Sequence, residues 1–164
     1  MSPRATNRIL GIDPGFDRLG LAVIEGDPSK PVHLWSECVT PPKGGAQERL
    51  AVVYRAVIDA IETHHPTTLA LETLYFSTNK KTAIAVAEAR GVVLAAAGAH
   101  GLFVREFSPG QVKLAVTGHG AADKSAIARM VPRLINLPPK KRLDDEMDAI
   151  AIAIAGLAGN YPHT

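Results

Sequence analysis

Four acidic residues, Asp13, Glu72, Asp145 and Asp148, have the types and spacing of a metal-binding cluster. Asp13 and Glu72 each end a short apolar run that is typical of a buried strand, where a carboxylate is costly unless it is paired or metal-bound. Asp145 and Asp148 are three residues apart, so in a helix they share one face. Two like charges on one face repel each other unless a cation lies between them. We therefore expect the four side chains to converge on a cation.

The donor set indicates which cation and which chemistry. Carboxylate oxygens without Cys or a certain His are ligands of Mg²⁺ or Mn²⁺ rather than zinc. In a two-ion site, one ion lowers the pKa of an attacking water and the second, about 4 Å away, stabilises the leaving oxygen. The segment Gly11–Gly15 matches neither the dinucleotide-binding nor the P-loop glycine pattern, which argues against an ordinary P-loop ATPase. The acids predict phosphodiester cleavage with Mg²⁺, or Mn²⁺ in its place, and two ions per active site.

Some of these acids also have a simpler interpretation. Asp13 precedes Pro-Gly and could form a turn through its own backbone. Asp144 or Asp145 could cap the last helix or favour its dipole. Because Asp144, Asp145 and Glu146 are adjacent, the identity of the third acid stays open among them. The spacing to Asp148 favours Asp145.

Composition is that of one globular domain. The 164 residues are 46% apolar and 21% charged, enough to bury a core without disulfides. We expect one domain over residues 1–164, with residues 1–7 flexible and residues 159–164 a short tail. Cys38 is the only cysteine and cannot form a disulfide within the chain, which fits a reducing compartment. A net charge of +2 is too small to identify a nucleic-acid partner by itself.

The chain shows no sign of a membrane span or export signal. The most apolar stretches, Val92–Ala99 and Ala149–Ala158, fall short of the roughly 18 residues that a span needs. Residues 1–8 lack the apolar stretch of a signal peptide. We expect a cytoplasmic protein that does not enter a membrane.

Hydrophobic periodicity and turn residues predict the element order βββαβαβααα. Ser108-Pro109 and Asp123 are expected to start helices, and Pro132 should kink or end its helix early. Three successive strands followed by alternating helices and strands imply an α/β protein whose mixed five-stranded sheet has helices on both faces. The expected strands are Arg8–Asp13, Leu19–Glu25, Val32–Val39, Thr68–Glu72 and Leu102–Phe107, and the expected helices are Gln47–His64, Thr82–Ala99, Gly110–Val116, Lys124–Ile135 and Asp144–Leu157.

Six short motifs follow one another along nearly the whole chain. They are Ile9-Leu-Gly-Ile-Asp-Pro-Gly15, Leu71-Glu-Thr-Leu-Tyr-Phe76, Glu88-Ala-Arg-Gly91, Gln111-Val-Lys113, Ala122-Asp-Lys-Ser125 and Asp145-Glu-Met-Asp-Ala-Ile150. Each motif is weak alone, but six at compatible spacing are specific. Together they resemble the RuvC family of Holliday-junction resolvases.

The resemblance implies an RNase H-like fold and a divalent-metal-dependent endodeoxyribonuclease of recombination and repair. Such an enzyme binds a four-way DNA junction as a homodimer and nicks two strands symmetrically, beside a branch-migration motor of the RuvA and RuvB type. The segment Thr82–Ala99 looks like the family's dimer-contact helix. Carried over by position, the catalytic metal ligands are Asp13, Glu72, Asp145 and Asp148.

The resemblance also suggests DNA contacts. Tyr75 falls where the family places an aromatic residue that stacks on a base, although it could instead belong to the core or an interface. Lys113 and Lys124 match basic positions that contact phosphate or the reacting group. Further basic residues near the acidic motifs could line the DNA path: Lys80, Lys81, Lys140, Lys141 and Arg142.

Three other interpretations compete with this one. The first is an RNase H-like nuclease that cuts other branched DNA or RNA. The second is a non-catalytic junction-binding protein, which the presence of all four acids disfavours. The third is an actin-like ATPase, which the short chain and the lack of a second phosphate loop disfavour.

Overall fold

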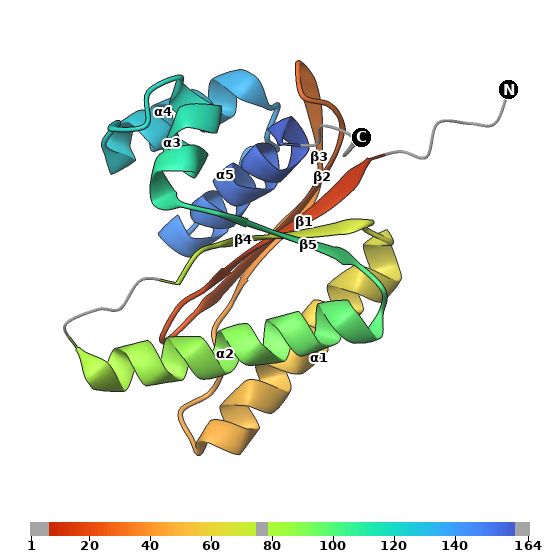
Figure 1. The fold of residues 1–164 in the computed structure, drawn as a ribbon, viewed down its shortest axis with the longest axis vertical. Coiled ribbons are helices and arrows are strands. Elements are labelled where there is room, and N and C mark those ends of the chain that lie inside the picture. Colours follow the sequence, from red (N-terminus) through yellow and green to blue (C-terminus); the bar gives the residue numbers. More distant parts are fainter. Residues whose placement is uncertain (1–6, 75–78, 160–164) are drawn as a thin grey trace, which may run out of the picture.

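The computed structural model describes residues 7–74 and 79–159, and these fold into one sheet with a helical layer on each face (Figure 1). The strands are β1 (Arg8–Pro14), β2 (Leu19–Asp27), β3 (Lys30–Val39), β4 (Thr68–Glu72) and β5 (Phe103–Phe107). The helices are α1 (Ala46–His64), α2 (Lys80–Ala99), α3 (Pro109–Thr117), α4 (Lys124–Leu134) and α5 (Asp144–Ala158). The predicted order of elements is confirmed.

The sheet is mixed, as predicted, with strand order β3-β2-β1-β4-β5. β1, β2 and β3 form an antiparallel meander, whereas β4 lies parallel to β1 and β5 parallel to β4. The parallel strands require crossover connections, which α1 and α2 supply. β1 and β4 therefore run side by side and end at the same edge of the sheet.

The core has two layers because residues alternate between the faces of the central strands. Ile9, Ala22 and Ala70 face α5, and behind it α3 and α4 complete that layer. Leu10, Ile12 and their neighbours on β2 and β4 face α1 and α2. α5 is apolar almost all round since it packs on the sheet with one side and on α3 and α4 with the other.

Two predicted helix starts are confirmed, and the predicted cap of the last helix is wrong. The Ser108 side chain caps α3 in a capping box with Pro109 in the first turn, and the Asp123 side chain accepts a hydrogen bond from the Ala126 N–H of α4. The capping interpretation of Asp144 or Asp145 is wrong, because Leu143 is the N-cap residue of α5 and forms no side-chain cap bond. α4 includes Pro132 and ends two residues later at Leu134, one residue short of the prediction, since proline removes one helical hydrogen bond and only the last turn follows it.

α2 is the one described helix that is long and apolar enough by composition to cross a membrane. Only 22% of its apolar window is buried inside the structure. It packs beside α1 (Figure 1), and its Arg90 is buried, where it donates to the Glu72 carbonyl and pairs with Glu106. A buried arginine that ties the helix to β4 and β5 indicates that α2 is a helix of this fold.

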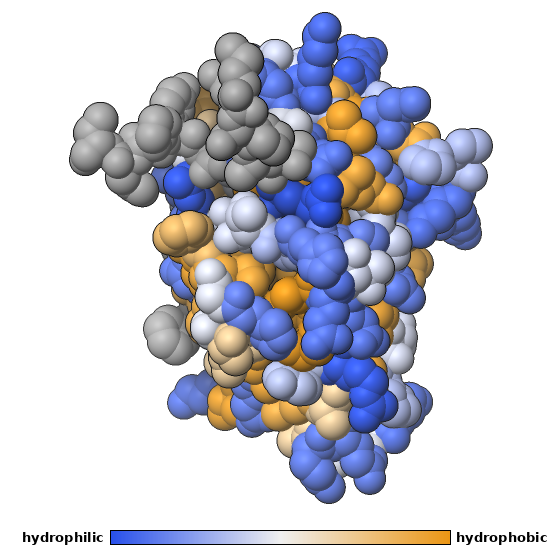
Figure 2. Space-filling view, turned by 90° about the vertical axis from the view of Figure 1, so that its right-hand side faces the viewer, coloured by the Kyte–Doolittle hydropathy of each residue, from blue (hydrophilic) through white to orange (hydrophobic). Residues whose placement is uncertain are grey.

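The surface seen in Figure 2 mixes apolar groups with hydrophilic side chains. This is the ordinary surface of a globular domain, to which apolar atoms contribute about half or more. The predicted flexible segment 1–7 lies outside the described residues except for Asn7, and the predicted tail 159–164 does so except for Gly159.

Candidate active site

The acids come together because three elements end or begin at one edge of the sheet. Asp13 lies at the end of β1 and Glu72 at the end of β4, and the parallel register pairs Ile12 with Leu71 just before them. α5 crosses this edge with its first turn. Asp145 and Asp148 belong to that turn and the next, so strand ends and helix start share one site.

Two glycines let α5 lie directly on the strands. A Cβ at Gly20 would stand 1.9 Å from the Asp145 carbonyl oxygen, and one at Gly11 would stand 2.4 Å from the Ala149 carbonyl oxygen. Backbone this close to backbone leaves no room for any other residue. These glycines fix the height of the Asp145 turn above β1 and β2.

The four acids lie close enough together for their charges to affect protonation. Burial, followed in order of effect by the charges of Asp148, Asp145 and Glu72, raises the pKa of Asp13 to about 7. Burial also raises the pKa of Glu72, with Asp148 as the next cause. The pKa of Asp148 is raised by burial, against the opposing effect of Lys124. Crowded, desolvated carboxylates of this kind are typical of functional sites.

Two basic side chains balance part of this negative charge. The Lys124 ammonium lies 3.5 Å from Asp148 Oδ2 and 3.8 Å from Asp144 Oδ2, and its pKa is raised mainly by Asp148. Arg18 Nε lies 2.7 Å from Asp145 Oδ2, although the two groups are not aligned as a hydrogen bond. The acids thus have cationic neighbours on the α4 side and on the loop after β1.

A cleft of about 230 Å³ opens beside the acids. Glu72 and Asp148 line it together with the predicted DNA contacts Lys113 and Lys124. Carboxylates and lysines on the walls of one cleft suit a phosphate group and the cations that accompany it.

The donor set fits a hard divalent cation. Among the residues that the structure describes, no three His, Cys, Asp or Glu side chains are close enough to hold one ion as they stand. The donors are nevertheless carboxylates throughout, and burial together with three acidic neighbours raises the pKa of Asp13 to about 7, so a divalent cation between them would offset the repulsion among these charges.

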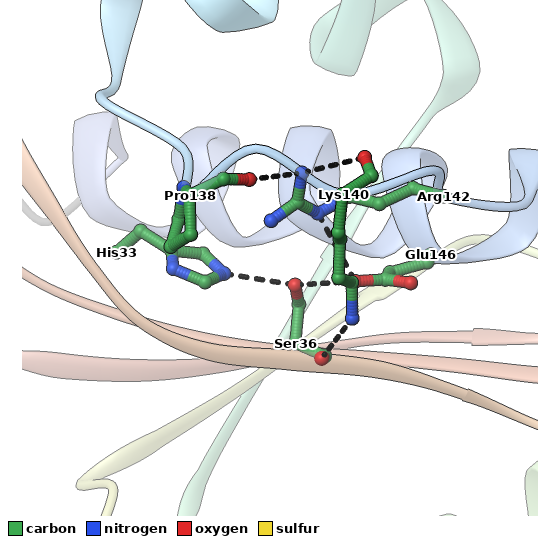
Figure 3. Close-up of polar contacts among 6 residues, drawn as sticks. All are labelled: His33, Ser36, Pro138, Lys140, Arg142 and Glu146. Carbon is green, nitrogen blue, oxygen red and sulfur yellow. Dashed lines mark hydrogen bonds and ion pairs between the residues drawn. The ribbon is translucent and has the colours of Figure 1, made fainter.

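The three adjacent acids at the start of α5 point in different directions. The Asp144 side chain is 80% exposed. The Asp145 side chain is 19% exposed and contributes to the raised pKa of Asp13. The Glu146 side chain is 4% exposed and accepts a hydrogen bond from Ser36 on β3 (Figure 3). This geometry favours Asp145 as the third member of the cluster.

Comparison with known proteins identifies the family. The family model described as crossover junction endodeoxyribonuclease RuvC matches residues 9–156. The chain belongs to the RuvC family. The match contains the sheet from the second residue of β1 onward, the four acids and all but the last two residues of α5.

Relatives in the RuvC family match over nearly their whole length. The chain is 44% identical to the crossover junction endodeoxyribonuclease RuvC of Moorella thermoacetica over 147 residues, which is 89% of this chain and 88% of that protein. It is 34% identical to T. thermophilus RuvC in a complex with Holliday junction substrate, with a TM-score of 0.85 and 93% and 96% of the two chains covered. The yeast mitochondrial Holliday junction resolvase Ydc2, at 15% identity and a TM-score of 0.67, covers 95% and 82% and shows the fold alone.

These matches confirm the resemblance seen in the sequence and the RNase H-like fold that it implied. RuvC family members are divalent-metal-dependent nucleases.

The other predicted DNA contacts are not among the residues that line the cleft beside the acids, and one of them lies outside the described residues. Lys80 and Lys81 are the first two residues of α2 and are exposed. Tyr75 lies outside the described residues. Lys140 and Arg142, in the segment before α5, pair with Glu146. Lys141 lies between them in the chain and is exposed.

Sequence reasoning missed Arg18, the nearest cation to Asp145. It follows the Asp-Pro-Gly turn, so a basic residue beside a predicted site was a usable signal. Its partner is far along the chain, and no periodicity connects a loop residue to a helix start. The bond between Ser36 and Glu146 was missed for the same reason, because only the tertiary fold brings β3 to α5.

Proposed function

We propose that this chain is a Holliday-junction resolvase that nicks two strands of a four-way DNA junction symmetrically. The carrying observation is the convergence of Asp13, Glu72, Asp145 and Asp148 at the shared edge of β1, β4 and α5. The structural relative bound to Holliday junction substrate supports the choice of substrate. Cleavage would leave 5′-phosphates and ligatable 3′-hydroxyls, as the resemblance implies.

In this proposal the four acids hold two Mg²⁺ ions, with Mn²⁺ able to replace them. When bound, such ions supply an activated water and stabilise the leaving oxygen of an in-line displacement. The chain's own residues orient the ions and neutralise part of the charge of the phosphate. Asp13 and Glu72 present oxygens from fixed strand ends, Asp145 and Asp148 present theirs from α5, and Lys113 and Lys124 offer positive charge to the phosphate in the adjoining cleft.

The remaining predicted contacts extend the DNA path. Lys80 and Lys81 are exposed at the start of α2, which follows β4 after a short segment, so they lie in the chain just beyond Glu72. We propose that they bind backbone phosphates. We propose that Tyr75, in the segment between Glu72 and these lysines, stacks on a base near the crossover.

We also propose that the enzyme works as a homodimer in the cytoplasm. α2 has exposed apolar residues, and Ile84 is 60% exposed, a surface that a second copy would cover. A two-fold protein matches the two-fold symmetry of a four-way junction. A branch-migration motor of the RuvA and RuvB type is the proposed partner, since it would bring the crossover to the sequence that is cut.

The test of the proposal is cleavage of a mobile four-way junction mapped at nucleotide resolution, with Mg²⁺ or Mn²⁺. Paired cuts at symmetric positions are expected, together with much slower cleavage of hairpin and flap DNA at the same salt concentration. Equal cleavage of all three substrates would favour a general branched-DNA nuclease.

Asp13→Asn provides the matched variant for this experiment. It removes one ligand charge but preserves shape, so we expect junction binding within about twofold of wild type and cleavage reduced by at least about 10³-fold. Gel-shift and cleavage assays on the same junction measure both. Undiminished cutting by Asp13→Asn would remove the metal site from the mechanism.

A further inference from the structure

Glu146, beside Asp145 in the first turn of α5, is buried in a polar cluster of its own. The Glu146 side chain is 4% exposed, and its Oε1 accepts a 2.6 Å hydrogen bond from the Ser36 hydroxyl. Lys140 Nζ lies 2.9 Å from the same oxygen. Arg142 Nε lies 3.2 Å from it, close enough for an ion pair although not aligned for a hydrogen bond. One buried charge therefore joins three separate segments (Figure 3).

The cluster continues onto β3. Because the single hydroxyl hydrogen of Ser36 goes to Glu146, the contact of 2.8 Å between His33 Nε2 and Ser36 Oγ requires the imidazole to donate. Lys140 Nζ also donates to the Ser36 carbonyl at 3.3 Å. His33 and Ser36 both belong to β3, an edge strand of the sheet, so the cluster attaches the start of α5 to a rigid element.

The segment before α5 depends on this attachment. Residues 135–143 form no helix or strand, and their internal bonds run from Arg142 Nη1 to the Pro138 and Lys140 carbonyls at 3.0 and 3.5 Å. The Lys140 and Arg142 side chains then bind Glu146. A connection without regular structure is thereby held to the sheet through one carboxylate.

The start of α5 lacks the usual means of fixing a helix terminus. Leu143 is its N-cap residue and forms no side-chain cap bond, so the first N–H groups of the helix have no side-chain acceptor there. Three adjacent acids in the first turn also repel one another. Asp145 lies in this turn, and its position over Gly20 needs an anchor that the cap does not supply.

We propose that Glu146 is a positioning residue that sets the place of Asp145 by tying the first turn of α5 and the basic segment 140–142 to Ser36 of β3. This inference rests on the proposed role of Asp145 as a metal ligand. It also assigns Lys140 and Arg142 to this cluster and leaves Lys141 as the residue of the segment that faces solvent. Residues that orient a metal ligand from behind typically change metal affinity or activity 10–100-fold, roughly, when altered.

The experiment is calorimetric titration of Mn²⁺ into the metal-free full-length protein without DNA, followed by steady-state cleavage of a four-way junction. For Glu146→Gln we expect Mn²⁺ affinity to fall about 10–100-fold, with a similar loss in kcat and an unchanged KM, because the DNA contacts are elsewhere. Ser36→Ala, a milder change that keeps the charge, should weaken Mn²⁺ binding in the same direction by a smaller factor.

Glu25→Gln is the matched control. Glu25 is a partly buried carboxylate that pairs with Arg8 at the opposite end of the β1–β2 register from Asp13. It should lower the melting temperature while Mn²⁺ affinity stays at the wild-type value. If Glu146→Gln and Ser36→Ala also bind Mn²⁺ as wild type does, the cluster only stabilises the fold and the inference is wrong.

Asp145→Asn separates this inference from the proposed function. Loss of Mn²⁺ affinity in Asp145→Asn with wild-type affinity in Glu146→Gln overturns the inference alone. Wild-type affinity and cleavage in Asp145→Asn would instead overturn the assignment of Asp145 as a ligand.

Discussion

Asp13 is the residue in which the conflict between folding and function is clearest. Burial and three neighbouring acids raise its pKa to about 7 from 3.8. An acid whose folded pKa exceeds its unfolded pKa costs stability as pH rises, because the unfolded chain releases the proton first. The fold thus tolerates a group that is unfavourable in the metal-free protein, which is common where catalysis requires clustered charge.

The pH dependence of metal-free stability tests this argument. Asp13→Asn should raise the melting temperature in EDTA at pH 8, where the stability gain is on the order of a few kcal/mol from a shift of about three pKa units. The gain should develop between about pH 4 and pH 7 and vanish at about pH 3, below the unfolded-state pKa of 3.8, where both states hold the proton. A variant that melts at or below the wild-type temperature at pH 8 would contradict the crowding of these acids.

Arg18 gives a second prediction for a single residue. Its charge lies 2.7 Å from Asp145 Oδ2 and opposes the binding of a second positive charge there. Arg18→Gln should therefore bind Mn²⁺ several-fold more tightly, as measured by calorimetry without DNA. The control is Arg49→Gln, which removes a guanidinium that bonds the Phe16 carbonyl of the same loop but does not touch Asp145. Weaker binding in Arg18→Gln would mean that Arg18 orients Asp145 rather than competing for it.

Among the elements, α5 decides where the acids meet. Its apolar faces fix it between the sheet and α3 and α4, and its close approach to β1 and β2 depends on Gly11 and Gly20. Gly20 lets the first turn of α5 lie directly on β2, and the Glu146 cluster attaches the same turn to β3. Rigid placement of this kind is what a site with two strand-end acids requires.

Gly20→Ala tests the packing of α5 on β2. The new methyl would overlap the Asp145 carbonyl, so the helix must move, and we expect a loss of about 2–4 kcal/mol in stability with a large loss of cleavage. Denaturant unfolding and the junction assay measure the two effects. Gly110→Ala is the control, because a methyl there meets only ordinary contacts, the nearest at 3.7 Å, in the first turn of α3. Wild-type stability in Gly20→Ala would show that α5 does not lie this close to the strand.

At the scale of the whole molecule, the proposed paired cuts require a dimer that holds two active sites. α1 and α2 cover one face of the sheet, and the acids and α3, α4 and α5 are gathered on the other face or at its edge (Figure 1). α2 thus presents its outer side without using the elements that form the active site. A dimer through α2 would leave both clefts open to DNA.

Ile84→Glu tests that arrangement. Ile84 is 60% exposed on α2, and a charge there should convert the expected dimer to a monomer in sedimentation velocity, with paired cutting of junctions reduced in parallel. Val32→Glu, at a comparably exposed apolar residue of β3, should leave the sedimentation coefficient unchanged. A wild-type protein that sediments as a monomer while making paired cuts would contradict the dimer.

The sequence by itself determined the order of the elements, the mixed sheet and the family, because periodicity, turn residues and local motifs are properties of neighbouring residues. It also singled out Asp13, Glu72 and Asp148, since acids at strand ends and on an apolar helix need a reason to be there. The spacing to Asp148 already favoured Asp145, but only the tertiary structure shows how it differs from Asp144 and Glu146, because each meets a different distant group: Lys124 for Asp144, Arg18 for Asp145, and Ser36 for Glu146. Such contacts depend on how α5 lies across the sheet, and no spacing along the chain records them.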